Sequence, residues 1–502
     1  MVQHLYMNRE ESCYKCVEMS YDRLPHEVET CFLYCGVFPR GFDIPSWKVI
    51  CLWIAEGLIK HQDTYTLEEI AEFYLNDLIS RNLLILQQRR FDGQIKTCRL
   101  HDMLHHFCRT EAGNKWLFQE IRLTSDQVIP SIQDQDTHRR LCIQPSILND
   151  FLSKRPFAEH VRSFYCFSSK QSKKIELSPN ILVIPKAFPL IRVMDIESLE
   201  FSFSRNFSHL IHLRYIAISG DFRDLPEPFG IFWNLQTLIL NTSTLEPTLE
   251  VKADIWNMLQ LRHLHINIPA ILPPPLPSGK AFCLQTLSVV TPESCKKDVL
   301  AKACQIRKLS IRGKMAGFLE TKGEINNLQE LKCLEHLKLL NDVLYMNDVL
   351  HLPPTFSQLV RTLRKLTLAN TRFAWREADR LGQLESLKVL KLKENAFTGY
   401  SWKPKNGFSA LQVLWIERAE FKTWEASELN FPVLRNLVLI SCDKLEAVPL
   451  ELANIPNLHE MRLENTSNAV KSAKDILESK IAKGIKFNLT IFPPEAGSKA
   501  TQ

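Results

Sequence analysis

The chain has 502 residues, and its 62 basic and 56 acidic side chains leave a net charge of only +6, too weak to indicate a nucleic-acid partner. Apolar residues make up 45% and charged residues 24%, as in ordinary soluble proteins, and no apolar run approaches the roughly 18 residues of an integral membrane segment. The start of the chain has no signal-peptide core, and the 14 cysteines have no framework of paired spacings. We therefore expect reduced thiols, a cytoplasmic location, and either several domains or one long repeat array.

The first part of the chain is predicted to hold three helices. An apolar helical segment covers residues 26–37, and Pro25 is suited to its first turn. A second helix covers residues 44–59 and is expected to stop near Gly57. The third helix opens at Thr66-Leu-Glu-Glu69, a capping box that satisfies the backbone N–H groups at a helix start.

A hairpin and a last helix complete this region. Residues 83–88 and 95–100 are predicted to be strands, joined around Asp92-Gly93, which is a good hairpin signal. The last helix runs from about residue 102 to residue 110. Helices followed by a two-stranded wing describe a winged-helix domain.

Many winged helices bind DNA, so this is an alternative function to weigh. A recognition helix should present several basic or amide side chains to a groove. The candidate helix, residues 46–56, presents only Lys48 and is otherwise apolar. A winged-helix DNA-binding protein is therefore disfavoured, and we expect no nucleic-acid partner.

From Ile191 to Leu463 the pattern apolar-x-x-apolar-x-apolar keeps returning, mostly at the spacing of about 20–29 residues that is typical of leucine-rich repeats. Members of the series begin at Ile191, Leu213, Leu235, Leu261, Leu284, Ile306, Leu334, Leu363, Leu387, Leu411, Leu434 and Leu458. In each member the fourth and sixth side chains point inward and those between them point outward. A single repeat cannot bury its leucines alone, so neighbouring repeats stack and share one core. The predicted fold class is an α/β leucine-rich-repeat solenoid, a horseshoe with a parallel concave sheet, preceded by a small helical winged-helix domain.

These patterns divide the chain into four parts. We predict a winged-helix domain at residues 1–120, a connector at 121–155, the leucine-rich-repeat domain at 156–490 and a flexible tail at 491–502. The connector is inferred from its polar, charged composition, which suits a surface segment. The tail beyond about Asn488 is expected to fray.

Four motifs in the first part stand in the order seen in plant intracellular immune receptors. They are Ser20-Tyr-Asp-Arg-Leu-Pro25, Cys31-Phe-Leu-Tyr-Cys-Gly-Val-Phe-Pro39, Leu52-Trp-Ile-Ala-Glu-Gly57 and Leu100-His-Asp102. With the repeats that follow, the chain resembles nucleotide-binding leucine-rich-repeat receptors of the coiled-coil class, especially late blight resistance proteins of nightshades. The resemblance implies a disease-resistance protein that is not an enzyme. Its repeats would recognise a pathogen effector or a guarded host protein and hold an ADP-bound switch closed, until ATP exchange starts a defence response with localised cell death.

The chain departs from that family in one respect. No phosphate-binding loop G-x-x-x-x-G-K-[ST] occurs, and the coiled coil and the acidic metal-binding strand are also missing. We therefore expect a receptor truncated at its N-terminus, or an incomplete gene model, with no cofactor of its own. ADP or ATP is expected only for the full-length receptor, whose N-terminal nucleotide-binding domain would be a further partner. A non-functional remnant that serves as a generic interaction scaffold is the alternative.

His101 and Asp102 are the candidate cofactor-binding residues. Leu100-His101-Asp102 replaces the Met-His-Asp signature of the family, in which, as the resemblance implies, the histidine faces the nucleotide phosphates and the aspartate holds the local structure. The residues by themselves favour Asp102 as the N-cap of the last helix. We expect the cap to be real and the nucleotide-sensing role to be vestigial.

Two patterns resemble metal sites, and we expect neither to bind metal. His101 and His105 share a helix face, as in H-E-x-x-H, but an aspartate replaces the glutamate and no third ligand lies near. Cys13-x-x-Cys16 with Cys31-x-x-x-Cys35 could form a zinc knuckle, but the second pair lies in an apolar helix where cysteine packs as a small core residue. No catalytic residues are predicted either.

The outward positions of the repeat strands predict a binding surface. The middle repeats contribute the basic residues Lys308, Arg312, His336, Lys338, Lys365, Lys391 and Lys393. Apolar side chains stand beside them at Trp415, Val438 and Ile440. The end repeats place acidic residues at Asp195, Glu197, Glu417, Glu460 and Glu464. An aromatic anchor beside complementary charge is typical of a binding hot spot, so we predict that an acidic surface docks here, either of a pathogen protein or of the receptor's own switch domain. Alternatively, the lysines only keep the solenoid soluble.

Overall fold

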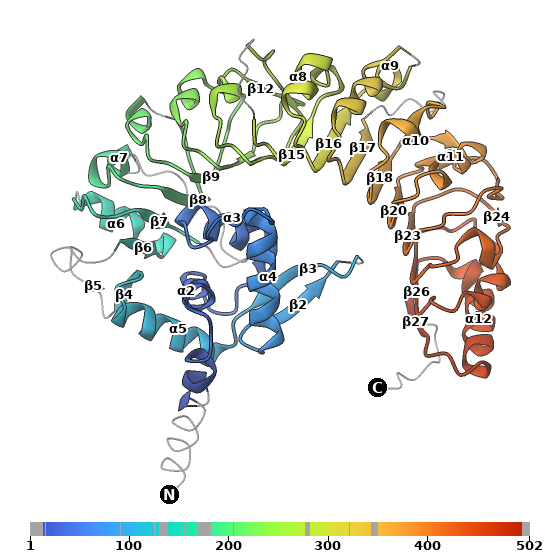
Figure 1. The fold of residues 1–502 in the computed structure, drawn as a ribbon, viewed down its shortest axis with the longest axis horizontal. Helices are drawn as coiled ribbons and strands as arrows, with labels where there is room; N and C mark the ends of the chain where they lie inside the picture. Colours follow the sequence, from blue (N-terminus) through green and yellow to red (C-terminus); the bar gives the residue numbers. More distant parts are fainter. Residues whose placement is uncertain are drawn as a thin grey trace, which may run out of the picture. The chain divides into compact units, whose positions relative to one another are not determined.

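The computed structural model describes residues 14–15, 17–90, 92–124, 127–129, 139–154, 157–167, 182–203, 205–276, 282–320, 322–342 and 350–493. The chain forms two compact units (Figure 1). The first unit comprises residues 1–246 and 252–267, and the second comprises residues 247–251 and 268–502.

The first unit opens with the predicted winged-helix domain. Its elements are α2 (His26–Tyr34), β1 (Ile44–Pro45), α3 (Ser46–Glu56), α4 (Leu67–Ser80), β2 (Ile85–Arg89), β3 (Ile95–Arg99) and α5 (Asp102–Asn114). Gly57 ends α3 in a left-handed conformation (φ 75°), and Thr66 and Glu69 form the predicted capping box of α4. The wing gains a third strand that the sequence did not predict, because β1 pairs with β3.

A parallel sheet of repeat strands makes up the rest of the first unit. Its strands, in spatial order, are β4 (Gln119–Thr124), β6 (Arg140–Ile143), β7 (Ser163–Tyr165), β8 (Val193–Glu200), β9 (Tyr215–Gly220), β11 (Thr237–Thr242) and β13 (His263–Ile266). Smaller elements of this unit are β5 (Gln127–Ile129), β10 (Asp224–Leu225), α6 (Leu148–Ser153) and α7 (Ile184–Ala187).

The sheet corrects the predicted connector at 121–155. Strand β4 pairs with β6, and β6 pairs with β7, so the described strands β4 and β6 within this range already belong to the repeats. Its polar composition was misleading, because a short strand needs only a few inward apolar side chains, here Ile121, Leu141 and Ile143.

The second unit continues the repeats. Its main parallel strands are β15 (Thr286–Val290), β16 (Lys308–Gly313), β17 (His336–Asn341), β18 (Lys365–Ala369), β20 (Val389–Lys393), β23 (Val413–Glu417), β25 (Asn436–Ile440), β26 (Glu460–Glu464) and β27 (Asn488–Phe492). Shorter strands are β12 (Leu249–Val251), β14 (Ala270–Ile271), β19 (Phe373–Ala374), β21 (Phe397–Thr398), β22 (Ser401–Trp402) and β24 (Thr423–Trp424). Its helices are α8 (Lys297–Lys302), α9 (Met315–Leu319), α10 (Phe356–Leu359), α11 (Asp379–Gly382) and α12 (Val470–Ala482).

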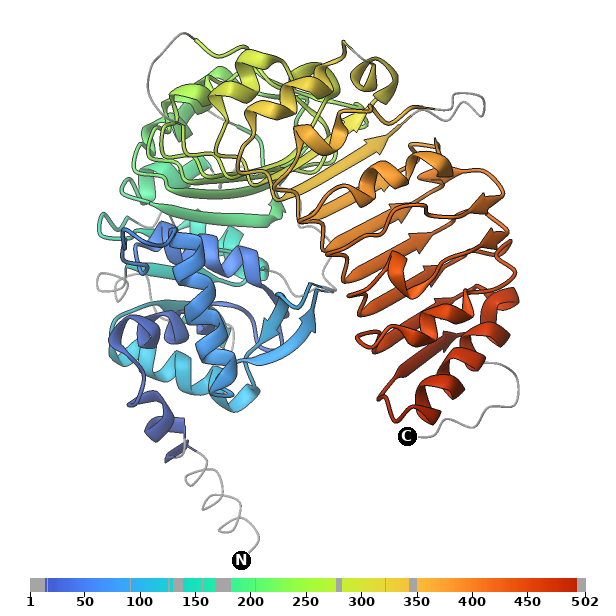
Figure 2. The ribbon, with the colours of Figure 1, turned by 45° about the vertical axis from the view of Figure 1, so that its right-hand side comes forward.

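The register of the second unit follows the sequence pattern. Figure 2 shows its later strands running side by side, from orange to red. The fourth residue of each motif faces the fourth residue of the next, in the series Leu309, Leu337, Leu366, Leu390, Leu414, Leu437 and Met461. All seven are buried, which confirms the predicted solenoid. Strand β27 pairs with β26, so the expected fraying beyond Asn488 is wrong for residues 488–492.

A stack of tryptophans crosses three repeats of the second unit. The rings of Trp375 and Trp402 have centroids 4.8 Å apart, and those of Trp402 and Trp424 are 5.2 Å apart with planes only 11° from parallel. Phe397 and Phe431 pack against the stack. All three indoles are buried, so this tryptophan stack is a large part of the local core.

Candidate functional site

Helix α3 of the winged-helix domain lies against strands β8 and β9 of the first repeats (Figure 1). A surface helix normally buries one stripe, but α3 is buried on nearly every side, from Ser46 to Ala55. Two layers therefore cover it, the winged-helix core and the repeat sheet. The contact between the winged-helix domain and the first repeats, called here the docking contact, is the candidate functional site.

Lys48 is the centre of the first polar cluster of the docking contact. Its Nζ lies 2.9 Å from Asp195 Oδ2 and 2.7 Å from Glu197 Oε2, and only 8% of the side chain is exposed. Tyr215 donates to Asp195, and Asn241 donates to Glu197. Burial alone would lower the pKa of Lys48, but the two carboxylates outweigh it and raise the pKa. The ammonium is therefore charged and held between strand residues.

Glu68, near the start of α4, is the centre of the second cluster. Arg262 binds it with two parallel hydrogen bonds of 2.7 Å, and His263 Nε2 lies 3.0 Å from Glu68 Oε1. Burial opposes ionisation of Glu68, but the hydrogen bonds from Arg262 and His263 outweigh it and lower the pKa of the carboxyl. Beside this cluster Trp47 packs on His265, with ring centroids 4.5 Å apart. Bidentate geometry of this kind fixes orientation as well as charge.

Glu56, at the end of α3, is the centre of the third cluster. It accepts hydrogen bonds from Arg140 (2.8 Å), from Ser163 (2.6 Å) and from Tyr165. The Tyr165 hydroxyl also lies 2.7 Å from that of Tyr34 in α2. The Glu56 side chain is only 4% exposed, so these hydrogen bonds replace the water that would otherwise solvate its carboxylate.

Apolar packing joins the same two parts. One continuous core contains winged-helix residues such as Phe38 and, from the repeats, Tyr165, Phe167 and Tyr215. The rings of Phe38 and Phe167 stack with centroids 4.9 Å apart. A shared core of this kind is characteristic of one folded body rather than of two domains joined by a linker.

The second cluster gives the docking contact a pH dependence. Burial disfavours the charged form of His263, but the Cys51 thiol and the Glu68 carboxylate outweigh it and raise the pKa of the imidazole from 6.5 to about 9. The folded state holds the proton more tightly, so this stabilisation is complete below about pH 6.5 and is lost as the pH rises through about 9. We expect the free energy of unfolding of the first unit to fall by roughly 2–3 kcal/mol across that interval.

Urea titrations at pH 6, 7.5 and 9 measure this effect, with a His263→Gln variant as the comparison. The variant removes the titrating group, so its first unfolding transition should depend less on pH than that of the parent chain. Equal pH dependence in both chains would assign the effect to other residues.

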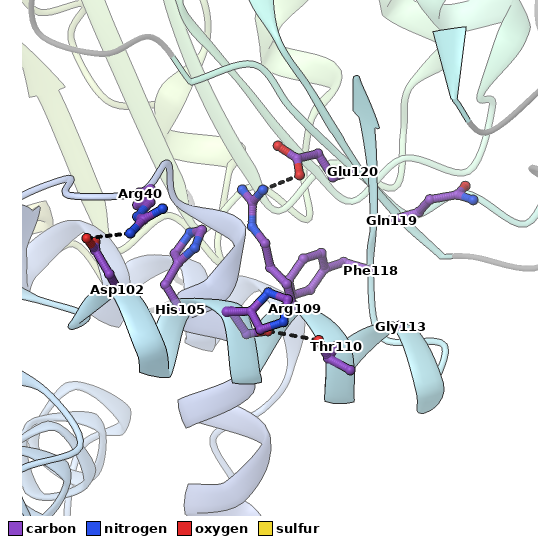
Figure 3. A pocket seen from close by; sticks show the side chains of 10 residues that line it. Arg40, Asp102, His105, Arg109, Thr110, Gly113, Phe118, Gln119 and Glu120 are labelled. Carbon is purple, nitrogen blue, oxygen red and sulfur yellow. Dashed lines mark hydrogen bonds and ion pairs between the residues drawn. The ribbon is translucent and has the colours of Figure 1, made fainter. Parts of the chain in front are cut away.

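The structure places His101 and Asp102 at the start of α5 (Figure 3). The predicted Asp102 cap is wrong, because His101 is the N-cap and its Nδ1 accepts a hydrogen bond from the Met103 N–H. Asp102 is instead the first residue of the helix, and Arg40 donates to it over 2.7 Å and lowers the pKa of its carboxyl. His101 thus supplies the acceptor that the sequence assigned to Asp102. It satisfies one of the backbone N–H groups that the first turn of a helix leaves without an intrahelical partner.

A pocket of about 470 Å³ lies beside Asp102, and Figure 3 shows the side chains that line it. Its guanidinium groups are already engaged, Arg40 by Asp102 and Arg109 by Glu120. Its carboxylates would repel phosphate oxygens. The described residues at this pocket therefore do not fit an adenine nucleotide, and the expected vestigial role of His101 and Asp102 stays a prediction.

The candidate metal ligands do not converge. His105 is buried with Nε2 2.8 Å from the Phe38 carbonyl oxygen, while His101 is exposed. Cys31 and Cys35 are buried, and burial raises the pKa of both thiols, as in core cysteines. Cys13 and Cys16 lie outside the described residues. Within the part of the chain that the structure describes, no group of three potential ligands could hold a metal ion.

The second unit brings part of the predicted basic surface together. Lys391 lies over the Trp415 ring, 4.4 Å from its centroid, and Lys393 lies 5.4 Å from the same ring. Lys393 also pairs with Glu417 at 2.7 Å, and Trp415 Nε1 donates to the same carboxylate. These contacts hold the indole in a fixed position on the strand surface.

Most members of the predicted surface lie in two rows that cross the strands. Strand register aligns Lys308, His336 and Lys365 in one row and Lys338, Lys391, Trp415 and Val438 in another. Arg312 pairs with Asp342 at 2.8 Å, which lowers the net charge of the surface. Ile440 remains partly exposed beside Glu417.

The prediction that Val438 belongs to the binding surface is wrong, because its side chain is 0% exposed. It stands between Trp415 and Arg462 on the adjacent strands. Strands lie about 4.8 Å apart, so two long neighbours enclose a short side chain even at an outward position.

Sequence reasoning missed the docking contact itself. It recorded Lys48 as the only basic residue of its helix, and Asp195 and Glu197 as outward acids of an early repeat, but did not pair them. A lone charge in an otherwise apolar helix was the available signal, since such a charge is almost never buried without a partner. Glu56, Glu68 and Arg262 carried no comparable local signal.

Two family models match the chain, now that the fold is known. Residues 37–108 match the disease resistance protein winged-helix domain, and residues 160–480 match a leucine-rich-repeat region. The first range contains the winged-helix residues at the centres of the three polar clusters, Lys48, Glu56 and Glu68. Together the matches define a class of protein that joins a disease-resistance winged helix to leucine-rich repeats.

Curated relatives come from the plant Solanum demissum. Putative late blight resistance protein homolog R1B-16 is 30% identical over 504 residues, which covers 97% of this chain and 38% of that protein. Homolog R1B-23 is 31% identical and is covered to 38%, and late blight resistance protein R1-A is 29% identical and is covered to 36%. The chain belongs to this family of plant disease resistance proteins. It spans less than two-fifths of the length of these relatives.

Proposed function

We propose that this chain senses pathogen molecules and regulates a nucleotide switch, acting in the cytoplasm by binding and not by catalysis. Its repeats recognise a pathogen effector or a guarded host protein, and in the resting state they hold the switch closed. ADP or ATP belongs to a nucleotide-binding domain outside this chain. The described residues contain no helix that is both long and apolar enough to cross a bilayer.

The docking contact carries this proposal. Its three polar clusters and the shared core make the winged-helix domain and the first repeats one body. A ligand that binds the first repeats would therefore act directly on the winged-helix domain, because both belong to this body. Buried charge pairs suit such a contact because they tolerate few alternative arrangements, which is a registry role documented in other proteins.

The basic surface of the second unit supports a recognition role. We define the basic stripe as Lys308, Arg312, Lys338, Lys365, Lys391 and Lys393 together with Trp415. Trp415 is held by Lys391 and Glu417, so docking it costs little side-chain entropy. An acidic protein surface is the partner chemistry that the stripe fits.

The test uses a receptor in which this chain follows the upstream region of R1B-16. In leaf tissue, Glu68→Arg should start cell death without a pathogen, because the new arginine then faces two other cations, Arg262 and His263, across the docking contact. The reciprocal exchange Glu68→Arg with Arg262→Glu restores opposite charges and should return the receptor to silence.

Glu72→Arg is the matched control, because Glu72 is an exposed acid of the same helix, one turn further on. It should remain silent at equal protein level. A Glu68→Arg receptor that accumulates normally and stays silent would contradict the regulatory role of the docking contact. Cell death from the reciprocal exchange as well would show that charge pairing is not what holds the switch.

A further inference from the structure

Strand β27 is the last strand of the second unit that the structure describes, and it lies at the edge of the sheet. Among the described strands it pairs with β26 alone. On that side the Asn488 N–H donates to the His459 carbonyl oxygen over 2.8 Å, and the Phe492 carbonyl oxygen also accepts a hydrogen bond. Backbone groups alternate in direction along a strand, so the N–H and C=O groups of Leu489 and Ile491 point to the open edge.

The apolar side chains of this last strand are less covered than those of the strand before it. Residues 485–492 alternate between half-buried apolar side chains and exposed side chains, and the half-buried set is Ile485, Phe487, Leu489 and Ile491. Met461 and Leu463, which face Leu489 and Ile491 in β26, are only 0% and 1% exposed. A solenoid needs a terminal repeat with a polar outer face to stay soluble. This end of the sheet instead offers a partly uncovered apolar layer.

Strand β27 also lacks the features that keep an edge strand from pairing. Natural edges are blunted by charged side chains, by proline or by a bulge. Residues 488–492 contain no charged side chain and no proline, and they pair with β26 in unbroken register. The outward positions of β26, in contrast, carry Glu460, Arg462 and Glu464. The edge of β27 is therefore able to pair with a further strand.

We propose that two copies of this chain associate through their β27 strands, which pair antiparallel about a two-fold axis at Thr490. In this register Leu489 of each copy stands opposite Ile491 of the other, and the two residues exchange the backbone hydrogen bonds of the open edges. The half-buried side chains of both copies lie on the same side of the joined sheet and cover one another. Each copy contributes its β27 edge, so the association closes at two.

A second copy fits this edge better than the tail of the same chain or a free peptide. Residues 494–502 contain no Val, Leu, Ile, Met or aromatic residue, so their sequence supplies nothing to cover Leu489 and Ile491. A free peptide would pair with the backbone groups but would bring no second apolar layer for Phe487. An identical repeat brings both, and threonine opposite threonine places no like charges together. The interface lies outside the docking contact and the basic stripe, and it does not rest on the proposed function.

Sedimentation equilibrium of the purified chain, over a concentration series in the micromolar range, measures the association. The parent chain should shift from monomer to dimer as the concentration rises. Thr490→Lys should weaken the dimer about tenfold or more, because it places two ammonium groups opposite each other at the axis. The Thr490 side chain is exposed, so the monomeric variant should melt like the parent.

Thr423→Lys is the matched control, because Thr423 is an exposed threonine of another strand, β24. It should dimerise like the parent. A mixing experiment then tests the two-fold axis itself. Thr490→Glu alone should be weakened as Thr490→Lys is, and an equimolar mixture of the two variants should recover the dimer. Recovery requires that position 490 of one copy meets position 490 of the other.

Three outcomes would overturn the proposal. A parent chain that stays monomeric over the whole series contradicts the association. Equal dimerisation of Thr490→Lys and the parent places the interface elsewhere, and a mixture that fails to recover contradicts the antiparallel register. A chain that ends at Pro493 should dimerise like the parent, and loss of its dimer would assign the contact to residues 494–502 instead of the β27 edge.

Discussion

Replacement of Lys48 by methionine is expected to lower the free energy of unfolding of the first unit by about 3–5 kcal/mol. The methionine keeps the apolar volume of the lysine stem but removes the cation. Asp195, which is 1% exposed, and Glu197 would then remain as two carboxylates without their counterion. Urea denaturation, followed through the first of the transitions expected for a chain with two units, measures the loss.

Neutral partners provide the control for Lys48. The triple variant Lys48→Met, Asp195→Asn, Glu197→Gln removes the buried charges as well as the cation. It should recover much of the stability, because replacing a whole buried ion cluster costs far less than breaking it. A single variant that loses under 1 kcal/mol, or a triple variant that is no better, would mean that water reaches the cluster and solvates the carboxylates.

Replacement of Trp402 by alanine is expected to destabilise the second unit by about 3–5 kcal/mol. The indole is 1% exposed and stacks on Trp375 and Trp424 from the repeats on either side. Its removal leaves a cavity and also breaks the tryptophan stack. Urea denaturation measures the loss, and near-ultraviolet circular dichroism should lose the signal of the coupled indoles.

Tyr400 gives a matched comparison two residues earlier. Its side chain is 78% exposed, so Tyr400→Ala should change the stability by no more than about 0.5 kcal/mol. If both variants melt like the parent, the stack contributes no more than surface packing. A large loss in Tyr400→Ala alone would contradict the burial pattern of this repeat.

The repeats could be predicted from sequence because their signal is local and recurs many times. Every motif in the series from Ile191 to Leu458 leads into a strand of the structure. Its inward apolar side chains can be buried only in the core that stacked repeats share. The winged helix was equally accessible, because its capping box and its glycine stop are local features. Helix caps were harder, as His101 shows, because two adjacent polar residues compete for the same N–H group.

The site was less predictable, because its partners are distant in sequence. Lys48 and Asp195 are 147 positions apart by their numbers, and nothing local links them. Outward position on a strand also proved insufficient to infer exposure. Asp195 is covered by a helix, and Val438 lies between large neighbours.

The shared core of the winged helix and the first repeats also bears on how such receptors can be recombined. A crossover that joins the winged helix of one parent to the repeats of another would mix the two halves of one core, including the pairs of Lys48, Glu56 and Glu68. Parents that differ at these positions would yield mispacked offspring. Viable exchange should therefore keep the first unit intact and vary the repeats beyond residue 267. Recognition can then change while the docking contact stays constant.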